Sequence, residues 1–95
     1  MNRKKIAALR RQLAQLRTRS RDLKERELVR FARKVGRYRD TSRGKEPTYV
    51  TDLFPGARPI SIPSHGTIKV GVAGNILDSL EEDIDRLSEM LGSEE

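Results

Sequence analysis

The chain has 95 residues, a formal net charge of +6 and 36% charged side chains, enough for one small domain with a modest core. It contains no cysteine and a single histidine, which excludes disulfides, a cysteine nucleophile and a metal site built from several histidines. No apolar run approaches the roughly 18 residues of a membrane span, and the basic N-terminus lacks the apolar stretch of a signal peptide. We therefore expect a cytoplasmic protein without a membrane-spanning segment.

The charges are divided unevenly along the chain. Residues 1–43 hold 16 Lys and Arg against 4 Asp and Glu, a net charge of +12, whereas residues 44–95 hold 4 against 10, a net charge of −6. A basic half predicts a surface for a polyanion, with RNA, DNA and an anionic membrane as the candidates, and the clustering favours a nucleic acid. The alternative is that the charges only keep exposed helices soluble.

The first predicted helix covers residues 3–17 and has one apolar face. The side chains of that face recur at spacings of three and four, at Ile6, Leu9, Leu13 and Leu16. Two uses of this face stay open. Either this face forms a seam with a second copy of the chain, although two heptads are few for a coiled coil, or it folds back onto the rest of the domain.

A second helix is predicted from about residue 22 to residue 35, with Gly36 as its C-terminal stop. Ser20 and Asp22 are candidate N-terminal caps. Because residues 18–20 contain neither Gly nor Pro, one long helix is the alternative.

Three short strands are predicted next, at 37–42, 48–53 and 60–62, followed by a helix over 72–91 and a frayed tail at 92–95. The expected class is therefore α+β, with a three-stranded antiparallel sheet covered by helices on one face. The side chains expected to be buried together are Phe31, Val35, Val50, Ile60, Ile62, Ile76, Leu80 and Ile84.

The turn at 43–47 is a candidate RNA-facing hairpin. Gly44 would let the backbone approach a phosphate, Arg43 and Lys45 would neutralise it, and Glu46 would accept a proton from a ribose hydroxyl. The alternative is an ordinary charged turn.

His65 is the second candidate for proton transfer. It follows the strand at 60–62, and the ordinary pKa of a histidine, about 6.5, suits acid–base chemistry. The alternative is a loop histidine that binds backbone.

Several stretches together resemble the HicA-type toxins. Residues 27–36 resemble the helix that opens that domain, and residues 60–66, Ile-Ser-Ile-Pro-Ser-His-Gly, resemble its strand ending in a valine-proline-x-histidine motif. Residues 68–71 and 75–77 are similar to the start of its last helix, which contains a Lys-x-Gly pattern matched by Lys69. The resemblance covers about residues 25–80.

The resemblance implies a small α-β-β-β-α domain, similar to a double-stranded RNA-binding domain, at residues 22–91. Residues 1–21 would be a basic helical extension and residues 92–95 a flexible tail. It implies a metal-independent mRNA endoribonuclease without a cofactor, neutralised by a HicB-like antitoxin. The family's histidine lies in a Gly-Ser-His turn, and Glu46 stands at that position here.

The expected function is therefore a HicA-like toxin component that binds mRNA. Arg43, Gly44, Lys45 and Lys69 are the expected RNA contacts, and Glu46 and His65 the candidate catalytic residues. The alternatives are an RNA-binding module that does not cleave, and an interaction module that uses the leucine-faced first helix.

Overall fold

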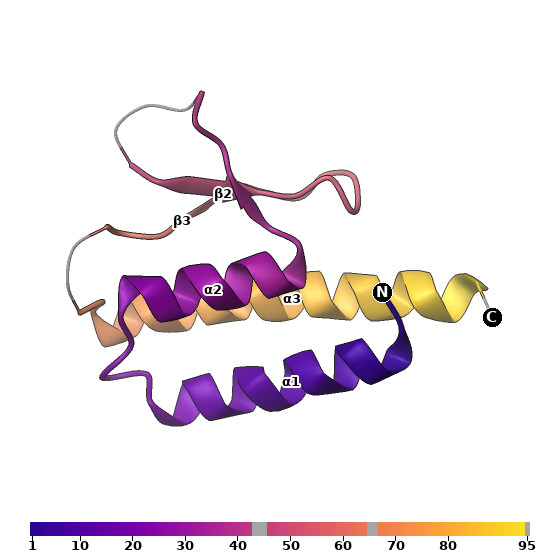
Figure 1. Ribbon diagram of the computed structural model, residues 1–95, viewed down its shortest axis with the longest axis horizontal. Helices are drawn as coiled ribbons and strands as arrows, with labels where there is room; N and C mark the ends of the chain where they lie inside the picture. Colours follow the sequence, from indigo (N-terminus) through magenta and orange to yellow (C-terminus); the bar gives the residue numbers. More distant parts are fainter. Residues whose placement is uncertain (43–45, 65–66, 95) are drawn as a thin grey trace.

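The computed structural model describes residues 1–42, 46–64 and 67–94 and contains three helices and a small sheet. The elements are, in order, α1 (Arg3–Thr18), α2 (Glu25–Val35), β1 (Tyr38–Arg39), β2 (Thr48–Val50), β3 (Ile60–Ser61) and α3 (Val70–Glu94). Figure 1 shows the three helices running alongside one another, with the sheet beyond α2. The predicted α+β class is confirmed, and the strands are shorter than predicted.

The first helix packs against the last one. The side chain of Asn2 caps α1 by accepting a hydrogen bond from the Lys5 N–H at 2.8 Å, and the helix ends at Thr18. The apolar face predicted for this helix is buried against α3 and belongs to the same core as the rest of the chain. Of the two uses left open, this structure has the face folded back onto the domain.

The start of α2 differs from the prediction. Neither Ser20 nor Asp22 caps it; the helix begins at Glu25, and the carboxylate of Glu27 accepts a hydrogen bond from the Lys24 N–H at 3.0 Å. The reason is Leu23, which is fully buried and whose carbonyl accepts a hydrogen bond from the Ile68 N–H at 3.0 Å. This contact holds the chain extended before α2, so α1 and α2 do not form one long helix.

Gly36 ends α2, as predicted. Its φ is +107°, and the Arg37 N–H donates to the Ala32 carbonyl at 2.9 Å, as in other helix ends closed by a left-handed residue. A Cβ atom at this position would collide with the side chain of Leu53. Both observations favour glycine here.

The three strands form an antiparallel sheet in the order β1-β2-β3. Tyr49 is paired with Arg39 on one side and Ile60 on the other, and Tyr49 and Ile60 are buried in the core. Because side chains alternate along a strand, Val50 and its partner Tyr38 lie on the opposite face. Val50, predicted to be buried, is therefore only half-buried.

The last helix is longer than predicted at both ends. It begins at Val70 rather than residue 72, and residues 92–94 continue the helix where a tail was expected. The other predicted core residues are all buried, namely Phe31, Val35, Ile60, Ile62, Ile76, Leu80 and Ile84.

Candidate nucleic-acid interface

One side of α1 is neutralised by α3. Arg10 Nη1 lies 2.9 Å from Asp85 Oδ1, and Arg17 Nη2 lies 2.8 Å from Asp78 Oδ1 and 3.1 Å from Glu81 Oε1. The hydrogen bond to Asp78 and the charges of both carboxylates raise the pKa of Arg17. These two arginines are therefore bound within the protein and are poorly placed to contact an external anion.

The other side of α1 faces α2. Gln12 Oε1 accepts a hydrogen bond from Lys34 Nζ at 3.4 Å, and Lys5 lies two helical turns before Gln12 on the same side of the helix. Lys4 and Arg11 project from the side opposite the buried face and are exposed. Arg10 and Arg17 thus pair with α3, whereas Lys4 and Arg11 point into solvent. Of the cations of α1 described so far, only Lys5 lies beside the cations of α2.

The exposed side of α2 is strongly basic. Arg26, Arg30 and Arg33 are spaced by four and three residues, so they lie along one side of the helix, away from its buried face. Within the described ranges, none of these three arginines forms an ion pair with a carboxylate, and the charge of Arg26 only adds to the lowering of the Glu27 pKa. This spacing is visible in the sequence, so the basic side of α2 could be predicted from it.

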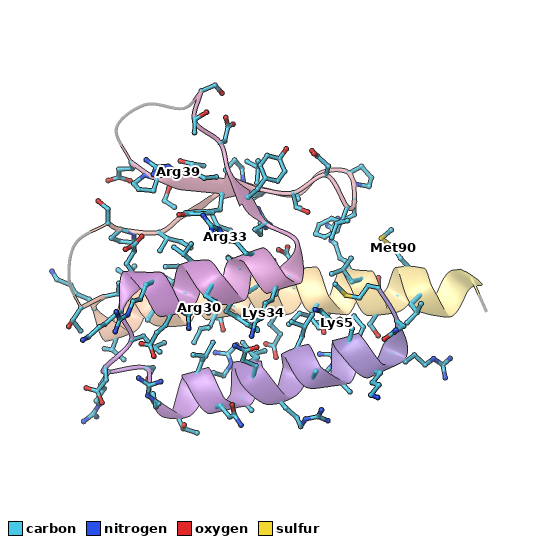
Figure 2. All side chains as sticks on the ribbon, viewed as in Figure 1. Lys5, Arg30, Arg33, Lys34, Arg39 and Met90 are labelled. Atoms are coloured by element: carbon cyan, nitrogen blue, oxygen red, sulfur yellow. The ribbon has the colours of Figure 1, made fainter. Side chains whose placement is uncertain are left out.

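These cations gather on one broad side of the molecule. Figure 2, drawn down the shortest axis, shows labelled cations from α1, α2 and β1 on the viewed side. The side chains of the cations that form this group are all exposed. We call this set the basic face: Lys5, Arg26, Arg30, Arg33, Lys34 and Arg39.

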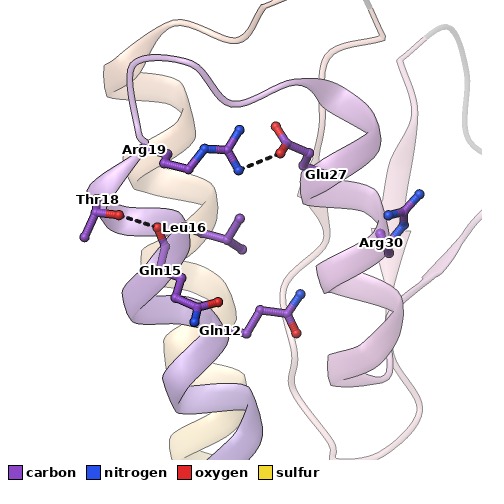
Figure 3. A pocket seen from close by; sticks show the side chains of 7 residues that line it. All are labelled: Gln12, Gln15, Leu16, Thr18, Arg19, Glu27 and Arg30. Atoms are coloured by element: carbon purple, nitrogen blue, oxygen red, sulfur yellow. Dashed lines mark hydrogen bonds and ion pairs between the residues drawn. The ribbon is translucent and has the colours of Figure 1, made fainter.

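A groove separates α1 from α2 within the basic face (Figure 3). It has a volume of about 470 Å³ and is lined by Gln12, Gln15, Leu16, Thr18, Arg19, Glu27 and Arg30. At its end, Arg19 Nη1 lies 2.8 Å from Glu27 Oε1. The hydrogen bond from the Lys24 N–H holds the pKa of the Glu27 carboxyl below its usual range, and the contact with Arg19 adds a smaller effect in the same direction. The acidic group of the groove is thus already paired, the Thr18 hydroxyl donates to the Gln15 carbonyl at 2.7 Å, and Gln12 Oε1 accepts from Lys34. The groups of the groove that face a ligand are therefore the Gln12 amide nitrogen, the Gln15 side chain and Arg30.

The loops before β2 and after β3 meet at the same end of the sheet. Thr48 is paired with Ser61, and the Ile62 N–H donates to the Pro47 carbonyl at 3.1 Å. Continuing this antiparallel register brings Glu46 level with Pro63. The sequence alone does not determine whether these two loops start from the same end of the sheet, because that depends on the order of the strands.

The predicted site residues are only partly within the described chain. Arg43, Gly44, Lys45 and His65 lie outside the described residues. Glu46 is exposed, and its carbonyl accepts a hydrogen bond from Thr48 Oγ1 at 3.2 Å. Lys69 is exposed directly before α3, on the chain that leads from the β3 end of the sheet.

In the described part of the chain, no three His, Asp or Glu side chains gather in a way that could hold a metal ion. The same residues include no helix with the length and apolar character of a membrane span. Comparison of the chain with protein-family models, with curated proteins and with solved structures found no match.

Proposed function

We propose that the protein binds RNA through the basic face, and that it is the RNA-binding component of a HicA-like toxin–antitoxin pair with a domain similar to double-stranded RNA-binding domains. One observation carries the binding proposal. The carboxylates of α3 pair with Arg10 and Arg17 on one side of α1, whereas among the described residues no ion pair joins a cation of α2 to a carboxylate. Cations that are held on a rigid helix without internal partners are suited to phosphates.

The test is RNA binding across a salt series. Phosphate contacts release counterions, so the logarithm of the affinity falls linearly with the logarithm of the salt concentration. Replacing Arg30 and Arg33 with alanine should weaken binding and reduce that slope by about 2, one for each lost phosphate contact.

The matched control is the double variant Lys4→Ala, Arg11→Ala, which removes the same charge from the outer side of α1. It should leave the slope nearly unchanged. Equal losses from both double variants would mean that only net charge matters, and a flat salt response would refute phosphate binding.

A second candidate function, metal-independent cleavage of RNA, is supported by the shared end of the sheet. Glu46 and the loop that contains His65 start from neighbouring positions there. In such a reaction the ribose 2′-oxygen attacks the adjacent phosphorus, a base accepts the 2′-hydroxyl proton, and the 5′-oxygen leaves. Glu46 is the proposed base, and Arg43 and Lys45 would stabilise charge on the phosphate.

The toxin proposal also implies a protein partner. A HicB-like antitoxin would cover this end of the sheet, because blocking RNA access neutralises the domain directly. Induced expression with and without the neighbouring reading frame, followed by growth and RNA integrity, tests this pairing. An interaction module built on the first helix has less support, because its leucine face is buried against α3.

A further inference from the structure

A separate cavity lies between α3 and the loop that joins β2 to β3. Figure 1 shows this loop turning over α3, and the cavity shares no residue with the basic face. Its volume is about 280 Å³, whereas the pockets of drug-sized molecules measure about 300–1,000 Å³, so it suits a smaller ligand. The polar and charged residues of its lining are Arg37, Arg58, Ser79, Glu82, Asp83 and Arg86.

The two walls of this cavity are fixed relative to each other. Asp83, on α3, pairs with Arg37, and Arg37 Nη1 donates a hydrogen bond to the Arg58 carbonyl in the loop at 2.8 Å. Arg37 and Asp83 are buried, so this connection lies in the protein interior. The side chains of Phe54 and Ile60 anchor the loop in the core on either side of Arg58. A ligand would therefore meet a preformed site, which lowers the entropic cost of binding.

The wall formed by α3 carries side chains that do not pair with each other. Ser79, Glu82 and Arg86 are spaced by three and four residues, so they lie along one side of the helix. Glu82 precedes Arg86 by four residues, a spacing at which opposite charges on a helix usually pair. Arg86 Nη1 instead donates to the Pro55 carbonyl at 3.2 Å, and its guanidinium carbon lies 5.4 Å from the centroid of the Phe54 ring. The loop thus orients Arg86 and leaves Glu82 without this cation.

Two charged groups of the cavity are available to a ligand. In the part of the chain that the structure describes, neither the Arg58 guanidinium nor the Glu82 carboxylate forms an ion pair, and both residues are exposed. A guanidinium binds a carboxylate or a phosphate, whereas a carboxylate accepts hydrogen bonds from an ammonium or amide N–H. A phosphate monoester carries nearly two negative charges at neutral pH and would be repelled by Glu82. The two groups together therefore favour a ligand that combines a carboxylate with a nitrogen donor.

We propose that the cavity binds a small molecule in which a carboxylate and a nitrogen donor share one carbon atom, as in a free amino acid or the C-terminal residue of a peptide. Arg58 and Arg86 bind the carboxylate, since the Pro55 carbonyl takes one of the N–H groups of Arg86 and leaves the others. Glu82 accepts a hydrogen bond from the nitrogen. Ala57 also lines the cavity, which favours a ligand with a small apolar side chain.

The test is titration of the full chain with three probes, followed through the NMR chemical shifts of its backbone amides. L-valine carries both groups, N-acetyl-L-valine keeps the carboxylate and an amide N–H as in the last residue of a peptide, and L-valinamide lacks the carboxylate. Valine or N-acetylvaline should shift the amides of the loop and of residues 79–86. The tighter of these two probes identifies the source of the ligand, and it should bind about tenfold more tightly than valinamide, which cannot form the charged hydrogen bonds of a carboxylate.

Two variants test the residues of the cavity. Arg58→Ala should weaken the binding of the tighter probe about tenfold, because a hydrogen bond to a charged group is lost. Glu82→Gln should weaken the binding of valine, which carries an ammonium group, more than that of N-acetylvaline. The matched control is Arg11→Ala, which removes an exposed arginine from α1 and should leave both affinities unchanged.

Valinamide that binds as tightly as valine and N-acetylvaline would overturn the proposal, because the carboxylate would then play no part. Equal losses from Arg58→Ala and Arg11→Ala would overturn it as well, since only net charge would then matter. Shifts confined to other parts of the chain, or no shifts with any probe, would show that the cavity does not bind this class of ligand. RNA binding is tested separately, because the cavity and the basic face have no residue in common.

Discussion

Arg37 and Asp83 form a buried ion pair that joins the end of α2 to the middle of α3. Arg37 Nε lies 2.7 Å from Asp83 Oδ2 and Arg37 Nη2 lies 2.9 Å from Asp83 Oδ1, and both residues are 4% exposed. The remaining nitrogen, Nη1, donates to the carbonyls of Tyr49 at 3.1 Å and Arg58 at 2.8 Å. One guanidinium thus connects α3 with β2 and with the segment before β3.

Removing one partner of this pair should destabilise the fold strongly. Asp83→Ala leaves the Arg37 charge buried without its counter-ion, which costs about 3–5 kcal/mol of unfolding free energy in comparable cases. Urea unfolding measures the loss. Asp85→Ala breaks the exposed pair with Arg10 and should cost less than about 1 kcal/mol. Similar losses for both variants would mean that the buried pair does not hold these elements together.

The packing of α1 should contribute measurably to stability. Leu9 and Leu13 are buried against α3, so Leu9→Ala and Leu13→Ala should each cost about 2–5 kcal/mol through lost burial and cavity formation. Leu53→Ala, at an exposed position, serves as the control and should cost little. Unfolding free energies that are unchanged by the α1 variants would show that α1 detaches from the domain in solution.

The order of elements could be predicted because it depends on local patterns. The periodicity of residues 6–16 and the stop at Gly36 both depend on neighbours in sequence, and both appear in the structure. The start of α2 could not be predicted, because Leu23 is held by Ile68 from a distant segment. Arg37 was equally hidden, since nothing local distinguishes it from the other arginines near it.

The candidate site was predictable only in part. The helical spacing of Arg26, Arg30 and Arg33 was present in the sequence and would have indicated one basic side of α2. The pairing of Arg10 and Arg17 with α3 was not, because it depends on how α1 lies on α3. The net charge of residues 1–43 therefore overstates the number of cations that can contact an external anion.

Stability should show an acid-sensitive contribution from Glu27. Its pKa is lowered in the folded protein by the Lys24 N–H and by Arg19, so its contribution is present above the ordinary pKa of about 4.3 and is lost as the pH falls through the folded value. Glu27→Gln should therefore be less stable than the wild type near neutral pH, with the difference shrinking below about pH 4.3.

The measurement is the unfolding free energy of both proteins between pH 7 and about pH 2.5. Glu82→Gln, at an exposed position for which the described structure shows no ion pair, is the control and should follow the wild type. A constant difference between Glu27→Gln and the wild type at every pH would argue against the ion pair with Arg19 and the hydrogen bond to Lys24.

The last prediction concerns the end of the sheet that carries Glu46, the proposed base. An exposed carboxylate is a weak base and a poor proton donor, whereas an imidazole can both accept and donate a proton near neutral pH. General acid–base catalysis contributes about 10²–10⁴-fold in rate, so we expect weak or absent cleavage of RNA by the wild type. Glu46→His should raise the rate, and any wild-type activity should suffer more from Glu46→Ala than from His65→Ala. The assay is cleavage of a model RNA in the presence of a chelator. The control for an added histidine is Glu82→His, on α3 beside the residues that lead into β3 and so at the other end of that strand. Strong wild-type cleavage that survives both alanine substitutions would place the reaction elsewhere on the protein.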